Sequence, residues 1–230
     1  MADPRDDRQA VLLKAGEIMF MVVFTMLFSG GMIPTFLVVK ALWLVDTYAA
    51  LVVPTAINAP EFWGRSLGWY GMALSDFLDL LPDGHPGGKE LKPALGRFVD
   101  ALIRFQDGES GLWHQVVDKG ERPDNWLETS CSSLFVYTIA KAVRHGCVGE
   151  DRMKAAWRGY RGLTERVRYD GRGRLIVPDI CVGTAAGDYA HYVARPVSDN
   201  DLHGVGAFIL ACVEISRANE RFGSHPAVRV

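Results

Sequence analysis

The sequence predicts an all-α fold in which helical hairpins follow an apolar helical segment. Two observations carry this prediction. No charged side chain occurs from Ile18 to Val39, a run long enough for a helix that crosses a bilayer. After Glu61, apolar residues recur at the three- and four-residue spacing of amphipathic helices. The chain of 230 residues therefore divides into an apolar segment, residues 1–59, and a helical domain, residues 60–230.

The apolar segment contains residues that interrupt helices. Ser29-Gly30-Gly31 and Pro34 would break or kink a spanning helix, and such breaks persist in a membrane only where other protein covers the backbone. Three interpretations stay open: membrane association through residues 17–58, a buried core helix, and a secretory signal peptide. The length of the run favours the membrane, and the lack of a small-residue cleavage site disfavours the signal peptide.

Five helices are expected in the domain from their apolar spacing. Lys141, Arg144 and His145 fall in the last turn of the third helix, where cations complement the helix dipole, and Gly146 follows them. The longest connection, from about residue 169 to 201, is rich in glycine, aspartate and aromatic residues, as functional loops often are. The expected helices cover residues 74–81, 91–105, 131–142, 153–163 and 205–213.

The composition excludes several classes of function. With 25 basic and 27 acidic residues, the formal net charge is −2, so the basic surface typical of nucleic-acid binding is not expected. The 49% of hydrophobic residues excludes general disorder. The four cysteines are widely separated and form no Cys-x-x-Cys pair, so neither a structural zinc site nor a disulfide framework is expected.

Trp63-x-Arg65-x-x-x-Trp69 is a candidate site for an acidic sugar. A guanidinium group offers a rigid fork to a carboxylate, and indole faces stack on sugar rings. The alternative is structural: the tryptophans anchor the core and Arg65 is a surface ion-pair partner. His203 follows Asp201, a residue that can cap the fifth helix. His203 is a candidate hydrogen-bond donor to a ligand, or else a satisfied structural histidine.

No catalytic residue is assigned from these patterns. Hydrolysis by paired carboxylates requires two acids a few ångström apart, which spacing along a chain does not reveal. The candidates are Asp76, Asp79, Asp118, Glu128, Asp188 and Asp201.

Four segments in order carry a family resemblance: residues 61–70, the 111–115 loop (Gly-Leu-Trp-His-Gln), residues 127–130 and residues 200–208. The series resembles the C-terminal half of the unsaturated rhamnogalacturonyl hydrolases, glycoside hydrolase family 105, which is related to family 88. The resemblance implies an (α/α)6 toroid, a cytoplasmic enzyme, and no metal or cofactor. It implies action on unsaturated galacturonyl-rhamnose from pectin, in which an aspartate hydrates the double bond. The resemblance also implies substrate-binding roles for Trp63, Arg65 and Trp69, and for His203.

The apolar segment has a resemblance of its own. Residues 28–40 and 44–48 resemble permease subunits of bacterial sugar ABC transporters, and this likeness covers Asp46, which is therefore not assigned as catalytic. In the hydrolases the catalytic aspartates precede the Trp-x-Arg motif. The resemblance thus implies an incomplete toroid with impaired activity, whose exposed helix faces favour self-association. The alternative function is a membrane-associated permease fragment that carries a hydrolase fragment as a passenger.

Overall fold

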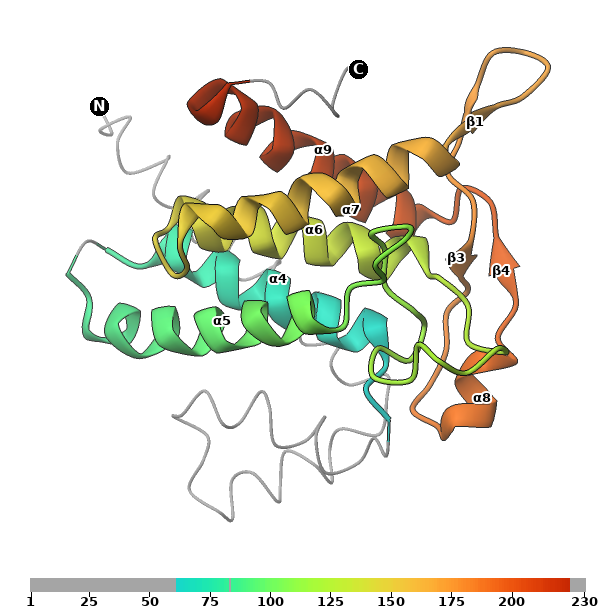
Figure 1. Cartoon of the computed structure of the whole chain (residues 1–230), viewed down its shortest axis with the longest axis horizontal. Coiled ribbons are helices and arrows are strands. Elements are labelled where there is room, and N and C mark those ends of the chain that lie inside the picture. The colour runs from blue at the N-terminus through green and yellow to red at the C-terminus, as the bar shows by residue number, and fades with distance from the viewer. Residues whose placement is uncertain (1–60, 83, 224–230) are drawn as a thin grey trace, which may run out of the picture. The chain divides into compact units, whose positions relative to one another are not determined.

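The computed structural model describes residues 61–82 and 84–223, all within the second of the two units into which the chain divides, Ala59–Val230. The expected apolar helical segment lies outside the described residues. Within them, five long helices form the domain (Figure 1). These are α4 (Gly64–Leu80), α5 (Pro86–Arg104), α6 (Thr129–Arg144), α7 (Met153–Arg166) and α9 (Leu202–Phe222).

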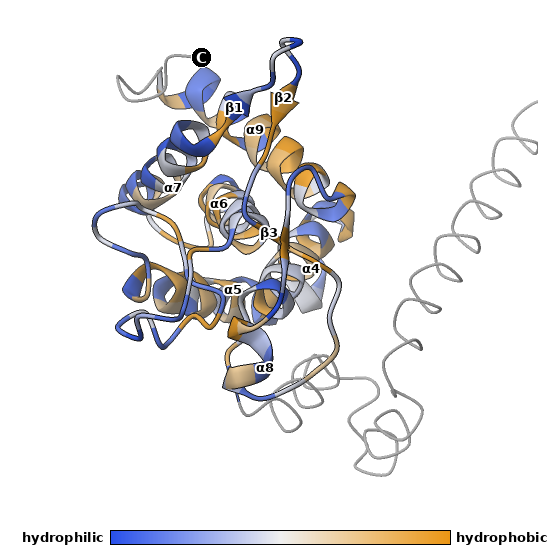
Figure 2. Ribbon diagram, turned by 90° about the vertical axis from the view of Figure 1, so that its right-hand side faces the viewer, coloured by the Kyte–Doolittle hydropathy of each residue, from blue (hydrophilic) through white to orange (hydrophobic). Residues whose placement is uncertain are grey.

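These helices confirm the prediction of an all-α domain built of hairpins. Helix α6 lies at the centre, ringed by the other four (Figure 2), and each of its residues from Thr129 to Val143 is buried. It packs mainly against α4, α7 and α9. Helices α4, α6 and α9 form one layer, and α5 and α7 pack on one side of it, which we call the rear; the opposite side is the front. The domain core is therefore the full circumference of α6.

Helix α4 approaches α6 closely because glycines face it. A Cβ on Gly68 would lie 2.7 Å from Leu134 Cδ1, and one on Gly71 would lie 2.8 Å from Thr138 Oγ1. Real Cβ atoms do not come so near, so the two helices touch along glycine positions.

Helix α4 also begins ten residues earlier than its apolar spacing predicts. The sequence indicated a helix from residue 74, whereas the structure starts it at Gly64. Glycines at helix-interior positions weaken the local propensity that such a prediction uses. Packing against α6 overrides that weakness, and the Trp-x-Arg motif therefore lies on the first turn of α4.

The long connection before α9 contains short elements that the sequence did not predict. Strands β1 (Arg168–Tyr169) and β2 (Leu175–Ile176) pair antiparallel, as do β3 (Ile180–Cys181) and β4 (Val197–Ser198). Helix α8 (Tyr189–Val193) lies between β3 and β4, and η1 (Glu150–Arg152) precedes α7. Strand β3 is buried, and it fixes the loop that lies over the N-terminal ends of α4, α6 and α9.

Helix α6, the third helix expected from the sequence, ends as predicted. Lys141 and Arg144 lie in the last turn of α6, His145 follows as the C-cap residue, and Gly146 has a φ of +66°. Among the described residues, none of the helices combines the length and the apolar character that a membrane crossing requires. The part of the chain for which membrane association was expected, residues 17–58, falls outside the described residues.

Candidate functional site

The N-terminal ends of α4, α6 and α9 meet at strand β3. The Gly64 amide donates to the Gln115 carbonyl at 2.8 Å, which attaches α4 to the loop before α6. The Thr129 amide, at the start of α6, donates to the Asp179 carbonyl at 3.1 Å. Gly204 of α9 packs on Ile180 of β3 so closely that a Cβ there would lie 2.6 Å from its side chain. Residues far apart in the sequence are thus held at one end of the domain.

Arg65 is a buried cation at this end, with 5% of its surface exposed. Its Nη2 donates to the Cys181 carbonyl and, at 3.2 Å, to the Val182 carbonyl. Its Cζ lies 5.2 Å from the centre of the Trp63 ring, which stacks on Tyr192 at the same centroid distance. The Nε atom is buried without a hydrogen-bond partner in the described part of the chain. Arg65 is therefore held rigidly, with one donor group still unused.

A second arginine contacts the next carbonyl of the same loop. Arg195 donates from Nη2 to the Gly183 oxygen at 2.6 Å. It lines an open hollow of about 500 Å³, whose wall also contains Trp126 and Arg166. This hollow contains none of the four predicted substrate-binding residues. Arg195 thus supports the loop as Arg65 does, but from a different place.

Trp69 follows Arg65 by one turn of α4 and is 40% exposed. Tyr70 and Gly71 both contact Phe98 of α5, so they mark the side of α4 that faces the rear layer. At roughly 100° per residue, Trp69 lies on the opposite side of the helix, with Arg65 nearby. The indole and the guanidinium therefore lie on the side of α4 away from α5.

His203 lies in the first turn of α9. Asn219 accepts a hydrogen bond from Trp157 of α7 at 3.2 Å, and this marks the side of α9 that faces the rear layer. Helix geometry places His203 on the opposite side. The structure thus turns His203, Arg65 and Trp69 toward the same side of the α4–α6–α9 layer, whereas Trp63 packs under the loop. Their substrate-binding role stays a prediction.

The Asp201 side chain was expected to cap α9, but in the structure it contacts His203. Its Nδ1 lies 2.6 Å from Asp201 Oδ1, and its Nε2 is buried with no partner among residues 61–82 and 84–223. Asp201 is the N-cap residue of α9, but its side chain makes no capping hydrogen bond. The carboxylate of Asp201 contacts the nearby imidazole of His203 instead. Asp201 therefore orients His203 rather than closing the helix.

Buried polar residues hold this end together, and one of them, Glu128, was among the candidate acids. Glu128 has no exposed surface, and its carboxylate accepts from the amides of Cys131 at 2.5 Å and Cys181 at 2.9 Å. The first of these bonds caps α6. Gln115 donates from Nε2 to Cys181 Sγ at 3.0 Å. Burial raises the pKa of the Cys181 thiol. Gln115 and Glu128 lie in the quoted motifs, whereas nothing in the sequence marked Cys181.

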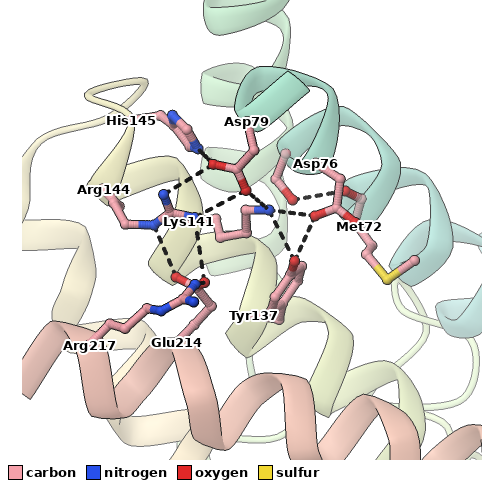
Figure 3. A network of polar contacts seen from close by, with 10 residues as sticks. Met72, Asp76, Asp79, Tyr137, Lys141, Arg144, His145, Glu214 and Arg217 are labelled. Atoms are coloured by element: carbon pink, nitrogen blue, oxygen red, sulfur yellow. Dashed lines mark hydrogen bonds and ion pairs between the residues drawn. The ribbon is translucent and has the colours of Figure 1, made fainter. Parts of the chain in front are cut away.

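A second polar cluster joins the three front helices at the other end (Figure 3). Lys141 is 2% exposed and lies 2.5 Å from Asp76 and 2.6 Å from Asp79. Arg144 donates to Asp79 at 3.1 Å and to the buried Glu214 of α9 at 3.1 Å. The cations that the sequence assigned to the helix dipole therefore also bind carboxylates on both neighbouring helices.

The protonation states in this cluster favour a structural role. Burial opposes the charge of Lys141, but hydrogen bonds to Asp76 and Asp79 outweigh it and raise its pKa. Burial likewise opposes ionisation of Asp79, yet hydrogen bonds from Arg144 and Lys141 lower its pKa. A catalytic acid needs a carboxyl group that keeps its proton near neutral pH. Asp79 does the reverse, so it is a poor candidate for that role.

Comparisons with known proteins identify the protein family of this chain. The profile of Glycosyl Hydrolase Family 88 matches residues 45–219, a range that begins upstream of the boundary expected at residue 59. A solved glycoside hydrolase of family 105 from C. acetobutylicum ATCC 824 superimposes with a TM-score of 0.66 at 37% identity. That match covers 69% of this chain and 46% of the other. The chain thus spans less than half the length of this solved relative.

Two curated relatives match more than half of this chain. The "24.9 kDa protein in picA locus" of Rhizobium radiobacter is 34% identical over 175 residues, which are 70% of this chain and 74% of that protein. The unsaturated rhamnogalacturonyl hydrolase YesR of Bacillus subtilis is 33% identical over 124 residues, 54% of this chain and 32% of YesR. The chain belongs to Glycosyl Hydrolase Family 88. It is a glycoside hydrolase by family, related to the unsaturated rhamnogalacturonyl hydrolases.

The resemblance to a permease is also found. The polygalacturonan/rhamnogalacturonan transport system permease YtcP of Bacillus subtilis is 79% identical over 48 residues. The match covers 21% of this chain and 17% of the permease. The chain therefore combines similarity to a hydrolase family with a short, strong similarity to a transporter subunit.

Proposed function

We propose that this chain binds an unsaturated galacturonyl-rhamnose disaccharide on the front of the α4–α6–α9 layer, as a glycosidase of the unsaturated rhamnogalacturonyl hydrolase type. The supporting observation is Arg65, a buried guanidinium fixed by two loop carbonyls, whose buried Nε has no partner among the residues that the structure describes. Such a group is costly to bury unless a partner completes it. The carboxylate of a uronic sugar is a suitable partner, since it accepts from a guanidinium with matching geometry.

The neighbouring side chains suit the rest of such a ligand. Trp69 exposes part of its indole for stacking on a sugar ring. The buried Nε2 of His203 has no partner within the described ranges, so a sugar hydroxyl would complete it, and Asp201 orients the ring. In the proposed reaction, water adds across the double bond of the unsaturated sugar. The resulting hemiketal opens and releases rhamnose.

We further propose that turnover by this chain alone is impaired. The reaction needs a carboxyl group that donates a proton to the double bond, and the family resemblance assigns that role to aspartates upstream of the Trp-x-Arg motif. The match to the solved family 105 enzyme covers 46% of that enzyme. Sugar binding without efficient hydrolysis is the expected behaviour, and we place this activity in the cytoplasm.

The second candidate function is that of a membrane-associated transport component. The observation that favours it is the 79% identity to a permease over 48 residues. Cell fractionation separates the two candidates. A permease-type anchor would keep the chain in the membrane fraction until detergent is added, whereas the hydrolase candidate predicts a chain that stays in the supernatant.

The test of the proposed function is sugar binding by calorimetry, with turnover followed as loss of the ultraviolet absorbance of the double bond. Trp69→Ala removes an exposed ring without disturbing the core and should weaken binding about tenfold, the effect of losing roughly 1.4 kcal/mol. Arg65→Ala should abolish it. Arg195→Ala is the matched control, because it also frees one loop carbonyl but lies outside the proposed site. Equal loss in both arginine variants would mean that Arg65 only supports the loop.

A further inference from the structure

The two outer edges of the α4–α6–α9 layer each carry an exposed apolar stripe. Residues of α4 that point away from α6 include Phe77 and Leu80, with 41% and 74% of their surface exposed. Residues of α9 that point away from α6 include Leu202, Ile209 and Val213, exposed by 87%, 56% and 42%. Side chains of this size and exposure along one face of a helix mark a surface that packs against another protein element.

The two stripes have the same spacing along their helices. Completed by smaller residues, the stripe on α4 is Ser66, Ala73, Phe77 and Leu80, and that on α9 is Leu202, Ile209, Val213 and Ser216. Each step along the first equals the corresponding step along the second. At the first two positions and at the last, a small side chain corresponds to a large one. The small Ser66 and Ala73 correspond to the large Leu202 and Ile209, and the large Leu80 corresponds to the small Ser216.

The fold also sets the stripes at the same height. Gly64 contacts Cys131 and Asp79 pairs with Arg144, so α4 and α6 run parallel. Arg144 also binds Glu214 at 3.1 Å, which brings Asp79 and Glu214 level with each other. Two residues before Asp79 and Glu214 lie Phe77 and Cys212. Phe77 is therefore level with Val213 to within one residue.

We propose that two copies of this chain join head to tail through these stripes, with α4 of each copy packed beside α9 of the other. Parallel helices at equal height would then interdigitate as neighbouring helices of the layer already do. A head-to-tail contact generates a ring when its rotation closes. A ring of two copies suits the match to the solved family 105 enzyme, since that match covers 46% of the enzyme and two such parts approach one whole.

A second copy fits better than another occupant, because the two stripes match each other. The two-copy ring would also turn both sets of Arg65, Trp69 and His203 toward a common axis. This inference rests on the helix edges and does not depend on which sugar binds.

The first test is the mass of the full-length chain in solution by light scattering coupled to size exclusion. A dimer is expected for the wild type, and a monomer for both Phe77→Asp and Ile209→Asp. Leu175→Asp is the matched control: this leucine is 42% exposed in β2, away from both stripes, and the variant should stay dimeric. Far-ultraviolet circular dichroism checks that each variant folds. A monomeric wild type would overturn the proposal.

A cysteine pair tests the geometry independently of variants that weaken the contact. Ala73→Cys and Ile209→Cys are made in separate chains, mixed, and treated with a short bifunctional thiol reagent. The head-to-tail ring predicts a crosslinked product in the mixture and none beyond the wild-type background in either variant alone. A product from Ile209→Cys alone would indicate an α9–α9 contact and would overturn the arrangement. Unchanged sugar binding in a monomeric Phe77→Asp variant would leave the proposed function standing.

Discussion

Replacing Lys141 by methionine tests how the front layer is held together. The lysine is 2% exposed and bridges Asp76 and Asp79 of α4 from the centre of the domain. Methionine has a similar length and volume, so packing is largely kept while the charge is removed. The substitution leaves two carboxylates without the cation that they share.

The expected loss follows from the exposure of these groups. Removing one partner of a fully buried ion pair costs about 3–5 kcal/mol. Asp76 and Asp79 are 40% and 39% exposed, so water partly replaces the ammonium group. Tyr137 also continues to donate to Asp76 at 2.6 Å. We therefore expect a loss of about 2 kcal/mol, which lowers the melting temperature by about 4–8 °C for a domain of this size.

The measurement is urea unfolding followed by tryptophan fluorescence, with Lys154→Met as the control. Lys154 is exposed on α7, so its replacement should change stability by less than about 0.5 kcal/mol. The pH dependence adds a second check. Because the pKa of Asp79 is lowered by Arg144 and Lys141, its contribution is full above about pH 4 and is lost as the pH falls. The variant should lose less stability on acidification. Equal stability of wild type and Lys141→Met would refute this account of the layer.

Three further predictions concern packing and loops. Gly68→Ala should cost about 1–3 kcal/mol through its clash with Leu134, whereas Gly88→Ala, with open space around it, should be neutral or stabilising; urea unfolding measures both. Glu128→Gln should cost about 1–3 kcal/mol by leaving a buried amide donor unpaired, measured as a lower melting temperature. Asn200 has a φ of +56°, so Asn200→Ala should melt below Asn200→Gly, and the reverse order would contradict left-handed strain there.

Parts of the candidate site were readable in the sequence because they lie in short motifs. Arg65 and Trp69 stand one helical turn apart, so once α4 is known to be a helix their common side follows. Glu128 directly precedes an apolar helical pattern, but the sequence indicated it as a candidate acid, and its capping of α6 became evident in the structure. What the sequence did not reveal is that Arg65 is bound by carbonyls of Cys181 and Val182, more than a hundred positions later. No local pattern encodes such a contact.

The amino-acid sequence by itself determined the helical class of the domain, the position of most helices and the end of α6. These depend on side-chain spacing and on a glycine with positive φ, which are local properties. Only the tertiary structure decided the early start of α4, the strands of the long connection and the pairing of Lys141 with two carboxylates. Each of these is stabilised by contacts with distant segments, whose energy outweighs local propensity and which form only when the helices pack.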